Sequence, residues 1–264
     1  MRATAVRRTV IAASAVSLAL LVTACGGSDA GDSKGGGDAK GGGKDGAAGS
    51  ANVKALTAAE LEKAALAQGD VEAHKITKAG PEDSVDAADI STDKEVCAPL
   101  ARALYGADEG KPTAGTKRQV VSEPDIKGGD LAEGDTEDAL AAAFDVTSTL
   151  LTLSSYDSET AEGNIAALRK AATECAGGFG VTTAGETQKV TKITEEKVTG
   201  GEEALAWTLM AEQDGQAAPL KLVALRQGGT VATFTSFNLA MAGGKSSTFD
   251  LPTAVIAAQA AKLA

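Results

Sequence analysis

Residues 188–239 read QKVTKITEEKVTGGEEALAWTLMAEQDGQAAPLKLVALRQGGTVATFTSFNL, and this stretch decides the fold. It consists of short runs rich in apolar and β-branched residues, separated by Gly-containing turns at 199–201, 213–215 and 227–229. Such turns are typical of β-hairpins. The predicted strands lie near 188–198, 204–212, 219–226 and 230–239. Because the connections are short, we expect each strand to be antiparallel to the next.

The residues on either side of this meander carry helix signals. Thr57 and Glu60 form a capping-box pattern, and Gly69 is a favoured residue after a helix C-terminus, so we predict a helix over 58–68. Further helices are expected from the Thr92-x-x-Glu95 pattern to Tyr105, over 158–176, and from Pro252 onward. Further strands are expected near 71–77, 116–123 and 146–153. The sequence therefore predicts an α+β fold, a twisted antiparallel sheet packed with helices.

The first 24 residues have the pattern of an export signal. Arg2, Arg7 and Arg8 precede an uncharged apolar run over 10–24. A positively charged start followed by a short apolar segment is typical of a secretory signal peptide. The run is shorter than the roughly 20 residues that a helix needs to cross a membrane, so we interpret it as a cleaved signal.

The signal ends in Val22-Thr23-Ala24-Cys25, which resembles the lipobox of bacterial lipoproteins. The resemblance implies cleavage between Ala24 and Cys25 and attachment of a diacylglyceryl group to Cys25. Two acyl chains hold a protein stably at a membrane, where a single chain would exchange. We therefore expect the mature protein to be lipid-anchored at the outer face of the cytoplasmic membrane, with the membrane as its first partner.

Residues 26–50 predict a tether. They read GGSDAGDSKGGGDAKGGGKDGAAGS and contain no large apolar side chain. A Gly-rich chain of this length has a mean reach of about 25 to 30 Å. The expected organisation is a signal peptide over 1–24, a lipidated Cys and tether over 25–50, and a single extracytoplasmic α+β domain over 51–264.

The three Cys residues suggest one disulfide. If Cys25 carries the lipid, Cys97 and Cys175 remain as a pair. Outside the cytoplasm the expected state of such a pair is a disulfide. The alternative is a metal site, which needs three or four ligands. The chain has one His, His74, so we expect no metal there.

Composition and motifs exclude several functions. The chain has 36 acidic and 25 basic residues and a net charge of -11, which argues against nucleic-acid binding. His74 has no accompanying Gly-x-Ser-x-Gly motif, so we expect no catalytic triad. Gly243-Gly244-Lys245-Ser246 resembles the end of a phosphate-binding loop, but Leu239 stands where that motif needs its first Gly. No cofactor is expected.

Two further groups of residues leave alternatives open. The acidic residues within 125–138 offer oxygen ligands for Ca²⁺, but their spacing differs from an EF-hand loop, and we interpret them as a solvated loop. Trp207, Phe234 and Phe237 fall on adjacent predicted strands, where they either pack in the core or form a pocket wall.

Two functional hypotheses follow. The first is a non-enzymatic binding or sensing module for a small apolar ligand or an envelope protein. The second is a cell-envelope hydrolase with an unrecognised carboxylate site, which the many acidic residues permit. A pocket with two buried carboxylates would favour the second hypothesis, and an apolar cavity beside Trp207 would favour the first.

The lipobox, the Gly-rich tether, the Ala-rich composition and the Leu56-Thr57-x-x-x-Leu61 opening followed by Gly69-Asp70-Val71 resemble actinobacterial surface lipoproteins. More remotely, two helical Cys residues ahead of a late antiparallel meander are similar to the extracytoplasmic sensor-type domains of mycobacterial Ser/Thr kinases and of freestanding lipoproteins. Members of that family often carry two disulfides, whereas this chain has Cys residues for one. The resemblance implies a sensor-like α+β domain and carries over no ligand-binding residue.

Overall fold

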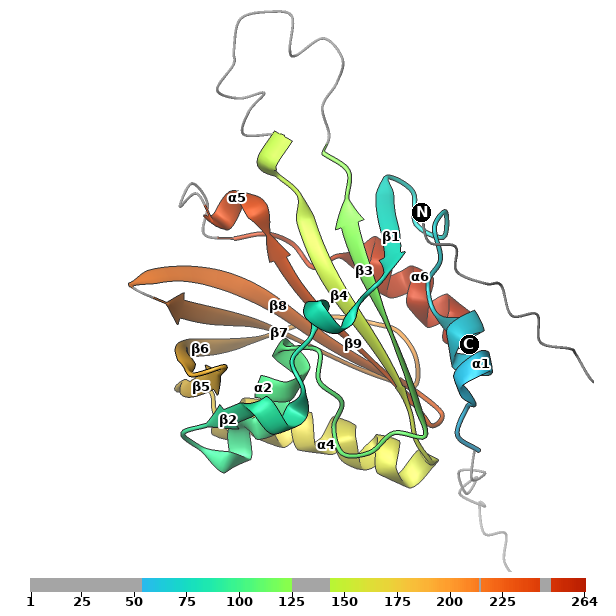
Figure 1. Ribbon diagram of the computed structural model, residues 1–264, viewed down its shortest axis with the longest axis horizontal. Helices are drawn as coiled ribbons and strands as arrows, with labels where there is room; N and C mark the ends of the chain where they lie inside the picture. Colours follow the sequence, from blue (N-terminus) through green and yellow to red (C-terminus); the bar gives the residue numbers. More distant parts are fainter. Residues whose placement is uncertain (1–53, 125–142, 214, 243–247) are drawn as a thin grey trace, which may run out of the picture. The chain divides into compact units, whose positions relative to one another are not determined.

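The computed structural model describes residues 54–124, 143–213, 215–242 and 248–264, and for residue 242 the backbone only (Figure 1). All of them belong to one compact unit, Ala48–Ala264. The predicted signal peptide, Cys25 and tether lie outside the described residues, as do the acidic cluster at 125–138 and the Gly-rich sequence at 243–246. These predictions therefore stay predictions.

The described strands form one antiparallel sheet of nine strands, in the order β1-β3-β4-β9-β8-β7-β6-β5-β2 (Figure 1). Its members are β1 His74–Lys78, β2 Ile90–Thr92, β3 Ala114–Ser122, β4 Thr147–Ser155, β5 Phe179–Thr183, β6 Glu186–Glu196, β7 Glu203–Gln213, β8 Gln216–Gln227 and β9 Thr230–Asn238. The predicted α+β class is confirmed. The predicted meander corresponds to β6 through β9, which are consecutive neighbours joined by antiparallel pairing.

Two strands were not predicted. β5 begins directly after Gly178, and β2 has three residues, Ile90–Thr92. β2 is too short to show a period of two, and it is held by pairing with β5, which pairs with β6 on its other side. The pairing of β2 with β5 joins residues 89 to 93 positions apart, from Thr92 with Val181 to Ile90 with Thr183, and a local pattern offers no signal for it.

The described α-helices are α1 Ala58–Ala64, α2 Ala98–Leu104, α4 Ser158–Glu174, α5 Leu239–Ala242 and α6 Thr253–Leu263. The capping box that starts α1 is confirmed, since the Thr57 N–H donates to the Glu60 carboxylate at 2.8 Å and the Glu60 N–H donates to the Thr57 hydroxyl. The predicted capping box at Thr92 and Glu95 is wrong. The Thr92 hydroxyl instead donates to the Lys94 carbonyl, and a 3-10 turn, Glu95–Cys97, leads into α2.

α1 ends four residues earlier than predicted, and the cause is a distant side chain. Gln259 of α6 is fully buried; its Nε2 donates to the Ala64 carbonyl at 2.8 Å, and its Oε1 accepts from the Leu66 N–H at 3.1 Å. These two bonds satisfy backbone groups that would otherwise continue the helix. The chain therefore leaves the helix at Ala65 and packs Leu66 into the core.

The sheet separates two hydrophobic cores. On one face, α2 and α4 pack over side chains that include Trp207, Leu209 and Leu222. On the other face, α1 and α6 pack over side chains that include Leu151, Val223 and Phe234. Successive residues of a strand point to opposite faces, which explains why Leu222 and Val223 belong to different cores.

The predicted disulfide is present in the structure. It joins Cys97, directly before α2, to Cys175, directly after α4, with the two Cα atoms 6.0 Å apart. Both side chains are fully buried. Ala48–Ala264 thus contains both cores and the disulfide, which are the features of an independently folding domain. In the part of the chain that the structure describes, no helix is long and apolar enough to span a membrane.

Candidate functional site

A cavity of about 430 Å³ opens on the sheet face that α2 covers, and we call it the apolar cavity. Its walls come from residues 82–85, from the end of α2, and from seven strands of the sheet, β3 through β9. Eight of the fifteen lining residues are hydrophobic: Val85, Leu104, Leu150, Val181, Val190, Ala211, Leu220 and Phe237. A hollow of this size with a mainly apolar lining is typical of a small-molecule site.

Strand register brings the apolar side chains of the cavity to one face. Leu150 of β4 is paired with Thr235 of β9, so these two side chains point to the same side of the sheet. Phe237 lies two residues beyond Thr235 and therefore shares that side. The cavity consequently depends on three-dimensional pairing between strands that are far apart in sequence.

The polar groups of the cavity wall have partners within the protein. The Tyr105 hydroxyl donates to Gln188 Oε1 at 2.8 Å, and the Thr235 hydroxyl donates to the Ala103 carbonyl at 2.9 Å. Burial raises the pKa of the Tyr105 phenol, so this group stays neutral. Because these polar groups are already hydrogen-bonded within the protein, a ligand inside the cavity does not need polar groups to pair with them. The same bonds fix α2 against the sheet.

The charged residues among those lining the cavity are Glu82 and Asp83, both exposed at its rim. They belong to a 3-10 turn, Pro81–Asp83, whose shape is held by the Gly80 N–H donating to Asp83 Oδ2 at 2.7 Å. Within the described residues, neither carboxylate forms an ion pair with Lys, Arg or His. The apolar cavity thus has an acidic rim.

The three aromatic residues proposed as a pocket wall are separated by the structure. Phe237 lines the apolar cavity and is 43% exposed. Trp207 lines a different hollow of about 240 Å³ beside α4, together with Arg169 and Glu195. Phe234 is fully buried in the core on the opposite sheet face. Of these three aromatic residues, only Phe237 therefore lines the apolar cavity.

The aliphatic residues of the cavity were not identified from the sequence. Leu104, Leu150 and Leu220 have the same local pattern as ordinary core residues, namely an apolar side chain at a helical or alternating position. Their periodicity predicts which face they occupy but not whether that face is filled.

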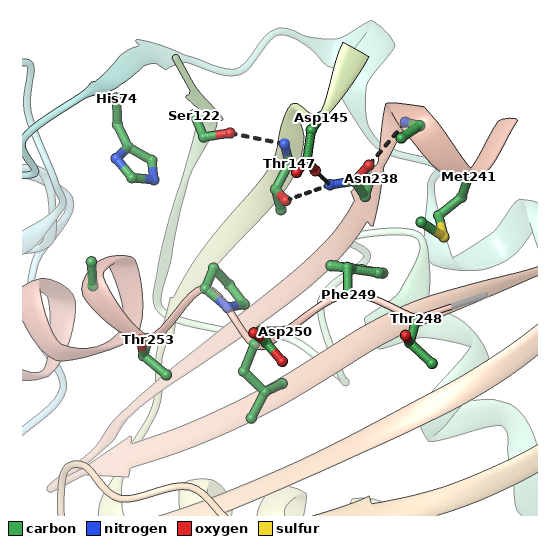
Figure 2. A pocket seen from close by; sticks show the side chains of 14 residues that line it. His74, Ser122, Asp145, Thr147, Asn238, Met241, Thr248, Phe249, Asp250 and Thr253 are labelled. Carbon is green, nitrogen blue, oxygen red and sulfur yellow. Dashed lines mark hydrogen bonds between the residues drawn. The ribbon is translucent and has the colours of Figure 1, made fainter. Parts of the chain in front are cut away.

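A second, larger hollow of about 730 Å³ lies on the other side of the sheet, beside the N-terminus of α6 (Figure 2). His74, Ser122 and Asp145 all line it, which are the residue types of a serine hydrolase. Each of the three side chains, however, has its hydrogen bond to a group outside this trio. Ser122 accepts from the Thr147 N–H at 2.9 Å, Asp145 accepts from Asn238 at 2.7 Å, and His74 Nδ1 lies 2.7 Å from the Glu72 carbonyl. No hydrogen bond within the described residues joins these three side chains into a relay.

The carboxylates of this second hollow are Asp145 and Asp250, and both are exposed. A general acid or base needs an environment that shifts its pKa, which burial would supply. Across residues 54–124, 143–213, 215–242 and 248–264, no three His, Cys, Asp or Glu residues are grouped to hold a metal ion. Neither the apolar cavity nor this second hollow therefore contains the buried carboxylate pair that would favour the hydrolase hypothesis.

The geometry defines an antiparallel α+β domain with an apolar cavity beside a disulfide-linked pair of helices. No protein-family model matches the chain, and no curated protein matches it. Among solved structures, it is similar to the extracellular domain of PknH from Mycobacterium tuberculosis, with 14% sequence identity and a TM-score of 0.48. That similarity covers 80% of this chain and 97% of the other. Similarity at this level does not assign a ligand or a role to this protein.

Proposed function

We propose that this protein is a lipid-anchored extracytoplasmic binding module, and that the apolar cavity holds a small apolar or amphipathic ligand. The observation that carries the proposal is the cavity itself, about 430 Å³ with a mainly apolar lining on the nine-stranded sheet. Burial of apolar surface is the main driving force for binding in such a site. The proposal requires no catalytic group.

The location outside the cytoplasm is supported by two features. The sequence at 22–25 resembles a lipobox, and the buried disulfide between Cys97 and Cys175 suits an oxidising compartment. A tether over 26–50 would leave the binding domain free to move near the membrane surface.

The Cys25→Ala variant tests the anchor. Without the thiol, no diacylglyceryl group can be attached, and we expect the protein to be released or to remain unprocessed. The measurement is fractionation of cells into washed membranes and soluble material, combined with the mass of the protein. Membranes that retain a fully processed Cys25→Ala protein would contradict lipid anchoring.

The Phe237→Ser variant tests the cavity. We expect it to weaken binding of the uncharged probe N-phenyl-1-naphthylamine by about five- to tenfold, because an aromatic wall of the site is lost. Binding is measured as the rise in probe fluorescence on titration into Ala48–Ala264.

The matched control is Phe144→Ser. Phe144 is 55% exposed and does not line the apolar cavity, so this change removes an exposed ring of the same size. We expect it to leave probe affinity within about twofold of the unmodified protein. Absence of probe binding by the unmodified domain, or equal weakening by both variants, would contradict the proposed site.

A further inference from the structure

We propose that the apolar cavity selects amphiphiles with a positively charged head group over those with a negatively charged one. This inference rests on the proposed binding function and adds the class of ligand. It places the apolar chain of the ligand against Leu150, Leu220 and Phe237, and its cationic head group at Glu82 and Asp83.

The first support is the position of the two carboxylates. Glu82 and Asp83 line the same cavity as the aliphatic residues, yet both are exposed, so they lie where the cavity meets solvent. A ligand whose chain fills the cavity would hold its head group at this boundary. The Gly80 N–H bond to Asp83 fixes the turn that presents both acids.

The second support is the balance of charge at the rim. Among the described residues, Lys117 is the cation hydrogen-bonded to a residue of the rim, since its Nζ donates to the Ser84 hydroxyl at 2.9 Å. The rim thus has two carboxylates and one bound ammonium group, and it is net negative. The net charge of -11 on the whole chain acts in the same direction at longer range.

The solvent exposure of Glu82 and Asp83 limits the size of the expected preference for cationic over anionic amphiphiles. Charges at a rim interact through water and salt, so each carboxylate contributes a modest attraction. Together they attract a cation and repel an anion of the same chain length. We therefore expect a difference of about tenfold in Kd between the two at low ionic strength, decreasing as salt is added.

The test is calorimetric titration of Ala48–Ala264 with three ten-carbon amphiphiles below their micelle concentrations. These are decyltrimethylammonium, uncharged decyl maltoside and decyl sulfate. We expect the Kd of decyltrimethylammonium to be about tenfold lower than that of decyl sulfate, with decyl maltoside between them.

The double variant Glu82→Gln/Asp83→Asn removes the charge while keeping the shape and the Gly80 acceptor. It should reduce the preference for decyltrimethylammonium over decyl sulfate to within about twofold. The matched control is Glu72→Gln/Glu159→Gln, which makes the same change in net charge at two exposed acids that do not line the cavity. The control should keep the preference.

The outcomes separate the two proposals. If neither the three amphiphiles nor N-phenyl-1-naphthylamine binds, the proposed binding function is overturned, and this inference with it. If only N-phenyl-1-naphthylamine binds, charge selection is overturned and the binding function stands. If all three bind with equal affinity, if decyl sulfate binds most tightly, or if the double variant keeps the preference, charge selection is overturned and the binding function stands.

Discussion

Loss of the disulfide between Cys97 and Cys175 is expected to lower the melting temperature of Ala48–Ala264 by about 9 to 18 °C. The two residues are 78 positions apart, and closing a loop of that length removes about 4.5 kcal/mol of chain entropy from the unfolded state. In a domain of this size, 1 kcal/mol corresponds to about 2 to 4 °C. The free energy of unfolding of a typical domain is about 5 to 15 kcal/mol, so the disulfide contributes a large share of the stability of this domain.

The measurement is a thermal melt of the unmodified domain beside the double variant Cys97→Ala/Cys175→Ala. The variant is preferable to a reductant because both Cys residues are fully buried and a reductant reaches them slowly. Thiol counting on the denatured, unreduced domain provides the control, since Ala48–Ala264 does not contain Cys25. Two free thiols, or identical melts, would contradict the stabilising disulfide.

Gly178→Ala is expected to destabilise the domain by about 3 kcal/mol or more, equivalent to a loss of about 6 to 12 °C in melting temperature. Gly178 links α4 to β5 and has φ +95°, a conformation that costs an L-residue energy. An added Cβ would also collide with the carbonyl oxygen of Val190 on β6. The backbone of β6 is paired with a strand on each side, so it cannot move away from the added Cβ as a flexible side chain would.

The neighbouring residue provides the control for this prediction. Gly177 has no positive φ, and a Cβ added there would meet nothing within 4 Å. Gly177→Ala should therefore change the melting temperature by less than about 2 °C. Denaturant unfolding of both variants gives the free energies directly. Equal stability of the two variants would show that the close approach of Gly178 to β6 is not required.

Local sequence patterns were sufficient to predict an element of the fold where the interactions that form it are between residues close in sequence. The capping box of Thr57 and Glu60 involves groups three residues apart, and the predicted start of α1 is confirmed. The Gly-containing turns at 199–201 and 227–229 connect consecutive strands, and the predicted meander is confirmed as β6 through β9. The pairing of Cys97 with Cys175 required only a count of Cys residues and an oxidising compartment.

Tertiary structure alone decided the features that depend on distant partners. α1 ends at Ala64 because Gln259, 195 positions away, binds the Ala64 carbonyl. The apolar cavity exists because β4 pairs with β9 and because residues 82–85 and the end of α2 leave the sheet face above Leu150 and Phe237 incompletely filled. Periodicity assigns each side chain to a face, but whether that face is covered depends on packing between segments that no local pattern connects.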